Sequence, residues 1–154
     1  MDLDKNIVWY LAGPMRGLPQ CNFPRFIEAA RVLREWGYTI KSPAEMDSPA
    51  TRADAMSCVA GEDRATYGGE TPGQILSRDV LEVADHVGGI IFLPGWWLSR
   101  GAKLEAHVAL DTGKKFGFFQ PEGTWCAWLD GLAPKNELIE LTADNIRKTL
   151  RHFI

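Results

Sequence analysis

Apolar and polar positions alternate along this chain in blocks that suit a layered α/β protein. Short segments of strand length predict strands at residues 7–12, 38–41, 89–93, 115–119 and 138–141. Apolar residues recur at helical spacing between them, which predicts helices at residues 22–37, 71–86, 99–113 and from 142 onward. Strand followed by helix in this rhythm indicates a parallel sheet with helices on both faces. We therefore expect a flavodoxin-like, doubly wound α/β fold of about five strands.

Residues that can cap a helix stand where these helices should begin: Asn22, Thr71, Ser99 and Thr142. Residues 44–70 lack such a pattern, apart from a possible helix within 51–60 and several glycines that suggest a loop. A long unpatterned loop in a compact protein is uncommon and usually functional. The sequence thus predicts one domain over residues 1–154, with a long loop or lid at about 47–70.

Composition narrows the class of protein. The 154 residues carry a formal charge of −3 and are 45% hydrophobic, without a basic block or a long apolar run, so we expect neither nucleic acid nor a membrane as partner. The first residues do not resemble a secretory signal, which favours a cytoplasmic protein. The three cysteines are widely spaced and the three histidines lack metal-ligand spacing. We therefore expect reduced thiols and neither a metal nor another cofactor.

One carboxylate has an unusual position in the predicted fold. The helix that follows the strand at 89–93 starts at Ser99 and carries Glu105 one turn further on. In open α/β sheets, ligands bind beyond the carboxyl ends of the strands, where helix N-termini point. Helical side chains lean toward the N-terminus, so Glu105 should lie over Gly101 and Ala102, two small residues that leave an open notch. The alternative is an ordinary N-cap followed by a surface glutamate.

The loop after the first strand is a second candidate. Tyr10 lies near the end of that strand, and Gly13 and Gly17 frame a tight loop from which Arg16 projects. A guanidinium group suits a carboxylate or a phosphate. A plain strand-to-helix turn with a solvated arginine is the alternative.

Two aspartates precede the third strand and form the last candidate. Asp79 and Asp85 are six residues apart, so they do not share a helix face, and at most one should face a site. The alternative for both is a surface charge, with Asp79 paired to Arg78. The familiar glycine-rich nucleotide motifs, the serine-hydrolase elbow and the HExxH zinc motif are all absent from the sequence.

Taken together, these clusters resemble the nucleoside 2-deoxyribosyltransferase superfamily, in particular its phage-type members. The matching motifs are AGPMRG at 12–17, NFP at 22–24, PAE at 43–45 and the segment LPGWWLSRGAKLE at 93–105. Among characterised relatives, the 2'-deoxynucleoside 5'-monophosphate N-glycosidases are the most similar. Deoxyribosyltransferases usually carry an aspartate near the position of Ser99, and the change to Ser99-Arg100 favours a phosphate.

The resemblance implies roles for the candidate residues. Glu105 would be the nucleophile at the anomeric carbon, and Asp79 would hold the sugar or assist proton transfer to the base. Tyr10 would shape the pocket near Glu105, and Ser99 and Arg16 would bind the 5'-phosphate. The remaining substrate-binding candidates are Gly13, Gly17, Gly101 and Asp85.

The expected function is hydrolysis, or base exchange, at the N-glycosidic bond of a 2'-deoxynucleoside 5'-monophosphate. A nucleotide-binding sensor or sink without turnover, and a glycohydrolase of a dinucleotide such as NAD, are the alternatives. Relatives complete their site across a two-fold interface, so we also expect a homodimer or a higher homo-oligomer. The aromatic residues expected to be exposed, and to be buried by that interface, are Trp96, Trp97, Trp125 and Trp128.

Overall fold

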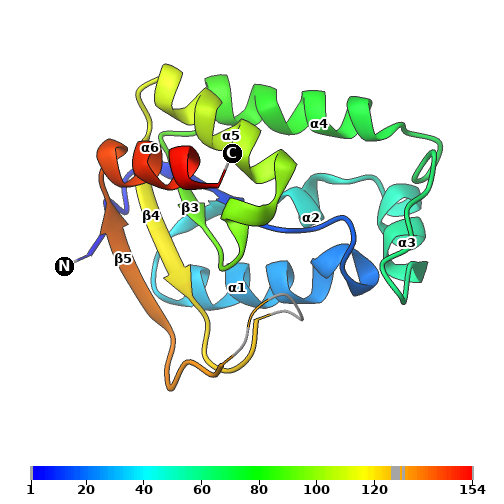
Figure 1. Ribbon diagram of the computed structural model, residues 1–154, viewed down its shortest axis with the longest axis horizontal. Coiled ribbons are helices and arrows are strands. Elements are labelled where there is room, and N and C mark those ends of the chain that lie inside the picture. The colour runs from blue at the N-terminus through cyan, green and yellow to red at the C-terminus, as the bar shows by residue number, and fades with distance from the viewer. Residues whose placement is uncertain (1, 126–128, 130, 154) are drawn as a thin grey trace.

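A five-stranded sheet forms the centre of the protein, as the computed structural model shows for residues 2–125, 129 and 131–153 (Figure 1). The strand order is β2-β1-β3-β4-β5, the order of flavodoxin-like folds. The strands are β1 Val8–Ala12, β2 Thr39–Lys41, β3 Gly89–Phe92, β4 Lys115–Gln120 and β5 Glu137–Leu141. The predicted α/β class is confirmed, and each predicted strand is found to within one residue at either end.

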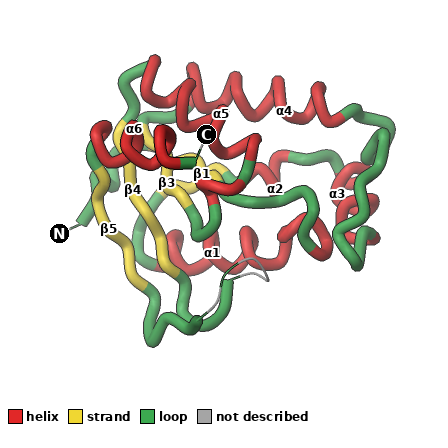
Figure 2. The backbone as a smooth tube through the Cα atoms, in the orientation of Figure 1, coloured by secondary structure: helices red, strands yellow, loops and turns green. Residues whose placement is uncertain are grey.

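Helices cover both faces of this sheet, with α1 on one side and α5 and α6 on the other (Figure 2). The helices are α1 Phe23–Glu35, α2 Pro43–Met46, α3 Pro49–Ser57, α4 Pro72–Leu81, α5 Arg100–Asp111 and α6 Ala143–His152. The predicted capping box at Thr71 and the predicted N-caps at Ser99 and Thr142 are present. In the described parts of the chain, no helix is long and apolar enough to cross a membrane.

The pleat of β1 assigns its side chains to two separate cores. Trp9 and Leu11 point to the core beneath α1, whereas Tyr10 and Ala12 point to the core beneath α5. All four side chains are almost completely buried, as expected of a central parallel strand. The alternation therefore places the Tyr10 hydroxyl on the side of the sheet that α5 covers.

The last strand corrects the prediction of an all-parallel sheet. β4 pairs in parallel with β3 but antiparallel with β5, with Phe118 opposite Ile139. A parallel pair requires a crossover, usually a helix, between its strands. The described part of the segment between β4 and β5 contains no helix, so the chain returns along the sheet edge in the opposite direction.

Two local predictions are also corrected. The segment at 47–70 is a loop only in part, because the possible helix within 51–60 is present as α3, which starts slightly earlier. Ser48 caps α3 by accepting a hydrogen bond from the Thr51 amide at 3.1 Å, and irregular chain occupies 47–48 and 58–71. Asn22 does not cap α1 through its side chain. It adopts a left-handed conformation with φ of 59°, and its side-chain amide donates to the Pro14 carbonyl at 3.0 Å. That contact ties the start of α1 to the loop after β1.

Candidate active site

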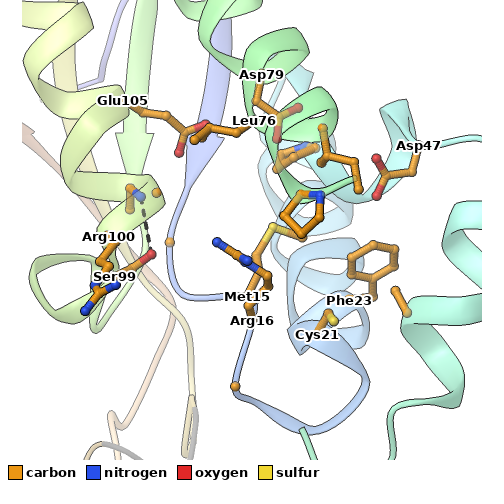
Figure 3. A pocket seen from close by; sticks show the side chains of 18 of the residues that line it. Met15, Arg16, Cys21, Phe23, Asp47, Leu76, Asp79, Ser99, Arg100 and Glu105 are labelled. Carbon is orange, nitrogen blue, oxygen red and sulfur yellow. Dashed lines mark hydrogen bonds between the residues drawn. The ribbon is translucent and has the colours of Figure 1, made fainter. Parts of the chain in front are cut away.

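A cavity of about 390 Å³ opens beyond the carboxyl ends of β1 and β3, between which the strand order reverses. Figure 3 shows α5 on one side of this cavity and α3 on the other, with α4 reaching in between them. We call one side the α5 wall, which comprises Tyr10, Ser99, Gly101 and Glu105. We call the other the α3 wall, which comprises Asp47, Thr51, Ala55 and Tyr67.

Glu105 lies at the closed end of the cavity. Its side chain is buried, and its Oε2 atom accepts a hydrogen bond from the Tyr10 hydroxyl. Burial raises the pKa of Glu105 to about 8, the negative charge of Asp79 adds to the rise, and the Tyr10 hydrogen bond opposes it. Burial and the charge of Glu105 also raise the pKa of Tyr10 well above its ordinary value, so Tyr10 is a neutral donor. The predicted position of Glu105 and its proximity to Tyr10 are therefore present in the structure.

Asp79 enters the same cavity from α4 (Figure 3). It is buried rather than solvated, and its Oδ1 atom lies 3.6 Å from Nη2 of Arg78. That oxygen is enclosed and has no hydrogen-bond partner among the described residues. Burial raises the pKa of Asp79 to about 7; Arg78 opposes this rise, and the charge of Asp47 adds to it. The alternative prediction, a solvated surface charge, is wrong for Asp79.

The two carboxyl groups make the cavity suitable for acid–base chemistry near neutral pH. When both pKa values lie near 7 to 8, one group can hold a proton while the other is ionised. The Cys21 thiol also lines the cavity. Burial raises the pKa of its thiol to about 11, so it remains protonated at neutral pH. Cys21 and Cys58 are both free thiols.

The loop after β1 brings a cation to the mouth of the cavity. A Cβ atom at Gly13 would lie only 3.0 Å from the Leu93 Cβ atom, so the close packing there favours glycine. Gly17 has φ of 85°, which favours glycine. Arg16 is exposed, and within the described chain it forms no ion pair. Figure 3 shows it reaching from this loop toward the first turn of α5.

The first turn of α5 lines the cavity beside Arg16. Ser99 caps the helix by accepting a hydrogen bond from the Ala102 amide at 3.2 Å, and its carbonyl accepts from the Lys103 amide at 3.0 Å. The amides of Arg100 and Gly101 have no intrahelical acceptor, as expected for the start of a helix. A Cβ atom on Gly101 would meet nothing within 4 Å, so the predicted notch in front of Glu105 is present.

Not every predicted residue reaches the cavity. Asp85 is exposed in the helical turn Glu82–His86 and does not line the cavity, whereas Asp79 does.

The prediction that four tryptophans are exposed is wrong for Trp96 and Trp125, which are both buried. Trp96 stacks on Phe92, with the ring centroids 4.2 Å apart. Trp97 is half-buried, and Trp128 lies outside the described residues. The homodimer remains a prediction.

The α3 wall was missed by sequence reasoning. Asp47 is buried there, and its Oδ1 atom accepts a hydrogen bond from Arg78 Nη2. Thr51 donates to the Tyr67 carbonyl at 2.9 Å, which holds the irregular segment against α3. The pattern Ser48-Pro49 could have revealed this wall, since a serine before a proline is typical of a helix start.

Comparison with known proteins gives one partial match. Residues 7–63 match the model of DUF4406, a domain of unknown function. The matched segment runs from β1 through α3, so it contains Tyr10, Arg16 and Asp47 but neither Asp79 nor Glu105. No curated protein matches the chain.

Proposed function

We propose that the protein cleaves the N-glycosidic bond of a 2'-deoxynucleoside 5'-monophosphate, with Glu105 as the nucleophile. The observation that carries this proposal is the buried Tyr10–Glu105 hydrogen bond at the closed end of a cavity that Asp79 also lines. The resemblance to the nucleoside 2-deoxyribosyltransferase superfamily supports the same assignment for these residues.

The first step breaks the bond between C1' and the base nitrogen. Positive charge develops on the sugar, and a Glu105 oxygen forms a bond to C1' as the base departs. In the free protein, the proton that the two carboxyl groups share lies more on Glu105, because its pKa of about 8 is above the value of about 7 for Asp79. The reaction proceeds from the form in which Glu105 is ionised and Asp79 is protonated, and Asp79 donates that proton to the departing base. The Tyr10 hydroxyl keeps Glu105 oriented and favours its ionised form.

The second step releases the sugar. A water molecule attacks C1', the bond from C1' to Glu105 breaks, and the proton of the water passes to Asp79. The products are the free base and 2-deoxyribose 5-phosphate, and both carboxyl groups return to their starting states. A second base in place of water would give base exchange by the same route.

The groups at the mouth of the cavity suit the phosphate of such a substrate. Arg16 supplies a guanidinium group, Arg100 lines the same mouth, and the Arg100 and Gly101 amides point outward from the start of a twelve-residue helix. This arrangement favours a nucleotide over a nucleoside, because a nucleoside would leave Arg16 without an anionic partner.

A panel of nucleosides and nucleotides tests the proposal, with release of free base followed by chromatography. We expect release from at least one deoxynucleoside monophosphate by the wild-type protein and none above background by Glu105→Gln. Tight binding of a nucleotide without release would identify the protein as a sensor or sink instead.

A further inference from the structure

The α3 wall contains a buried carboxylate that the reaction above does not use. The Asp47 side chain is only 6% exposed and lines the cavity. Arg78 occupies its Oδ1 atom, whereas Oδ2 accepts no hydrogen bond from the residues that the structure describes. Oδ2 is not fully enclosed by protein, and Figure 3 shows the Asp47 side chain pointing toward the cavity. A buried acceptor with a free oxygen facing a cavity suits recognition of a donor on a ligand.

Arg78 links this carboxylate to the reacting end of the cavity. Its Nη2 atom donates to Asp47 Oδ1 and lies 3.6 Å from Asp79 Oδ1, so a single nitrogen adjoins both aspartates. Glu70 lies 3.8 Å from Nη1 of the same arginine. A base that receives a proton from Asp79 therefore has its far edge within reach of Asp47.

The space between these groups suits a flat ring. Phe23 and Leu76 line the cavity between α1 and α4, and Figure 3 shows both facing the space toward which Asp47 also points. Aromatic and aliphatic side chains accept the faces of a base, while polar groups at its rim select its edge.

We propose that Asp47 is a specificity-determining residue that selects bases carrying an exocyclic amino group, as in cytosine or adenine, over bases carrying an oxo group at that position. This inference rests on the proposed function. An amino group donates a hydrogen bond to Asp47 Oδ2, whereas an oxo group would bring two acceptors together in a buried site. A site built around a hydrogen bond rejects an analogue that cannot make it, because the buried group is left unpaired.

Deoxycytidine and deoxyuridine monophosphate form a matched pair for the test, because they have the same size and differ at the amino or oxo group and its neighbouring ring nitrogen. For the wild-type protein we expect kcat/KM and affinity to favour the cytidine nucleotide by about tenfold or more. In Asp47→Asn, the amide oxygen can keep the contact with Arg78 while its NH2 group replaces Oδ2. The ratio of kcat/KM for the cytidine nucleotide to that for the uridine nucleotide should then fall to about one, or reverse in favour of the uridine nucleotide.

Asp63→Asn is the control variant, since Asp63 is an exposed aspartate on the same cavity and the substitution removes the same charge. It should keep the wild-type ratio. A wild-type ratio within about twofold of one, or an Asp47→Asn ratio equal to that of wild type, would overturn the inference while leaving the proposed function intact.

A second substrate pair covers the case in which Asp47→Asn does not fold. Deoxyadenosine and deoxyinosine monophosphate again exchange an amino group for an oxo group, and the wild-type protein should favour the former.

If no nucleotide is cleaved, the proposed function fails. Calorimetric titration with the same pairs then decides the role of Asp47, and equal affinities within each pair would reject it.

Discussion

The two walls of the cavity hold their buried carboxylates in different ways. On the α5 wall, Glu105 has a neutral phenol as its hydrogen-bond partner, and no cation is among the causes of its pKa shift. On the α3 wall, Asp47 is paired with Arg78. Burial raises the pKa of both groups, but at Asp47 the guanidinium group opposes the rise. A carboxylate without a counter-cation is suited to stabilise positive charge that develops on a substrate, whereas one fixed by an arginine is suited to act as a constant acceptor.

This difference assigns the two walls separate tasks in the proposed reaction. The α5 wall should control the chemical step and the phosphate, and the α3 wall should control the choice of base. Variants on the α5 wall should therefore change turnover for all substrates alike. Variants on the α3 wall should change the ratio between substrates.

The largest expected effect is that of Glu105→Gln on turnover. The amide has the same shape but cannot form the bond to C1', so kcat should fall by about a thousandfold or more. Asp111→Asn, at the exposed far end of the same helix, is the control and should match wild type. Base release measured under saturating substrate gives the result. Turnover by Glu105→Gln within tenfold of wild type would remove the distinction between the two walls.

The same variant should change how stability depends on pH. The pKa of Glu105 is about 8 in the folded protein and 4.5 ordinarily, so between these values the folded state holds a proton that the unfolded state has released. Wild-type stability should therefore fall as pH rises from about 4.5 to 8. Glu105→Gln lacks this loss and should be more stable than wild type at pH 9 by on the order of 5 kcal/mol, which should raise Tm by about ten degrees or more.

Asp47→Asn should show the same trend more weakly, because burial also raises the pKa of Asp47 while the half-buried Arg78 opposes that rise. Thermal melting of the three proteins at pH 5 and pH 9 makes the comparison. A Glu105→Gln variant whose advantage over wild type is the same at both pH values would contradict the raised pKa.

Arg16→Ala should weaken the preference for a phosphate. Its guanidinium group is free to pair with an anion at the mouth of the cavity, and a charge-assisted contact is worth about 1.5–3 kcal/mol. The affinity ratio between a deoxynucleoside monophosphate and its nucleoside should drop by about one to two decades. Arg25→Ala, an exposed arginine on α1, is the control. Equal wild-type affinities for the nucleotide and the nucleoside would show that the start of α5 is an ordinary helix cap.

Tyr10→Phe should have a smaller effect on turnover than Glu105→Gln, about tenfold at pH 7, since a single hydrogen bond is lost. The Tyr10 hydroxyl lowers the pKa of Glu105, so its removal should raise that pKa further. The acid limb of the profile of kcat/KM against pH should then move to higher pH. A tenfold loss with an unmoved acid limb would mean that Tyr10 shapes the cavity without acting on the charge of Glu105.

Sequence reasoning reached the α5 wall because simple rules place it. Glu105 follows from a strand end and an N-cap at Ser99, and the notch follows from the absence of a side chain at Gly101. The position of Tyr10 near Glu105 was implied by the family resemblance, and the alternation of side chains along β1 explains it. The positions of Glu105 and the notch depend on local features with a defined period, so the sequence is sufficient to predict them.

The start of α3 could have been predicted from Ser48-Pro49, but the pairing of Asp47 with Arg78 could not. Asp47 follows a helix of only four residues, and its partner Arg78 is 31 positions away on α4, so no periodic pattern connects the two. Asp79 and Asp85 could not be separated by spacing alone, because the choice depends on which face of α4 packs toward α5. The antiparallel edge strand likewise depends on the path of the chain between β4 and β5.

The stereochemistry of the reaction shows whether Glu105 is the nucleophile. If Glu105 forms a covalent bond to C1', a reaction run in aqueous methanol proceeds by two displacements at that carbon, and the methyl glycoside keeps the β configuration of the substrate. Proton NMR of the product from the preferred deoxynucleoside monophosphate distinguishes the two anomers. We expect the β-methyl glycoside of 2-deoxyribose 5-phosphate from the wild-type protein and no glycoside from Glu105→Gln. Formation of the α anomer would show a single displacement by solvent and would contradict Glu105 as the nucleophile.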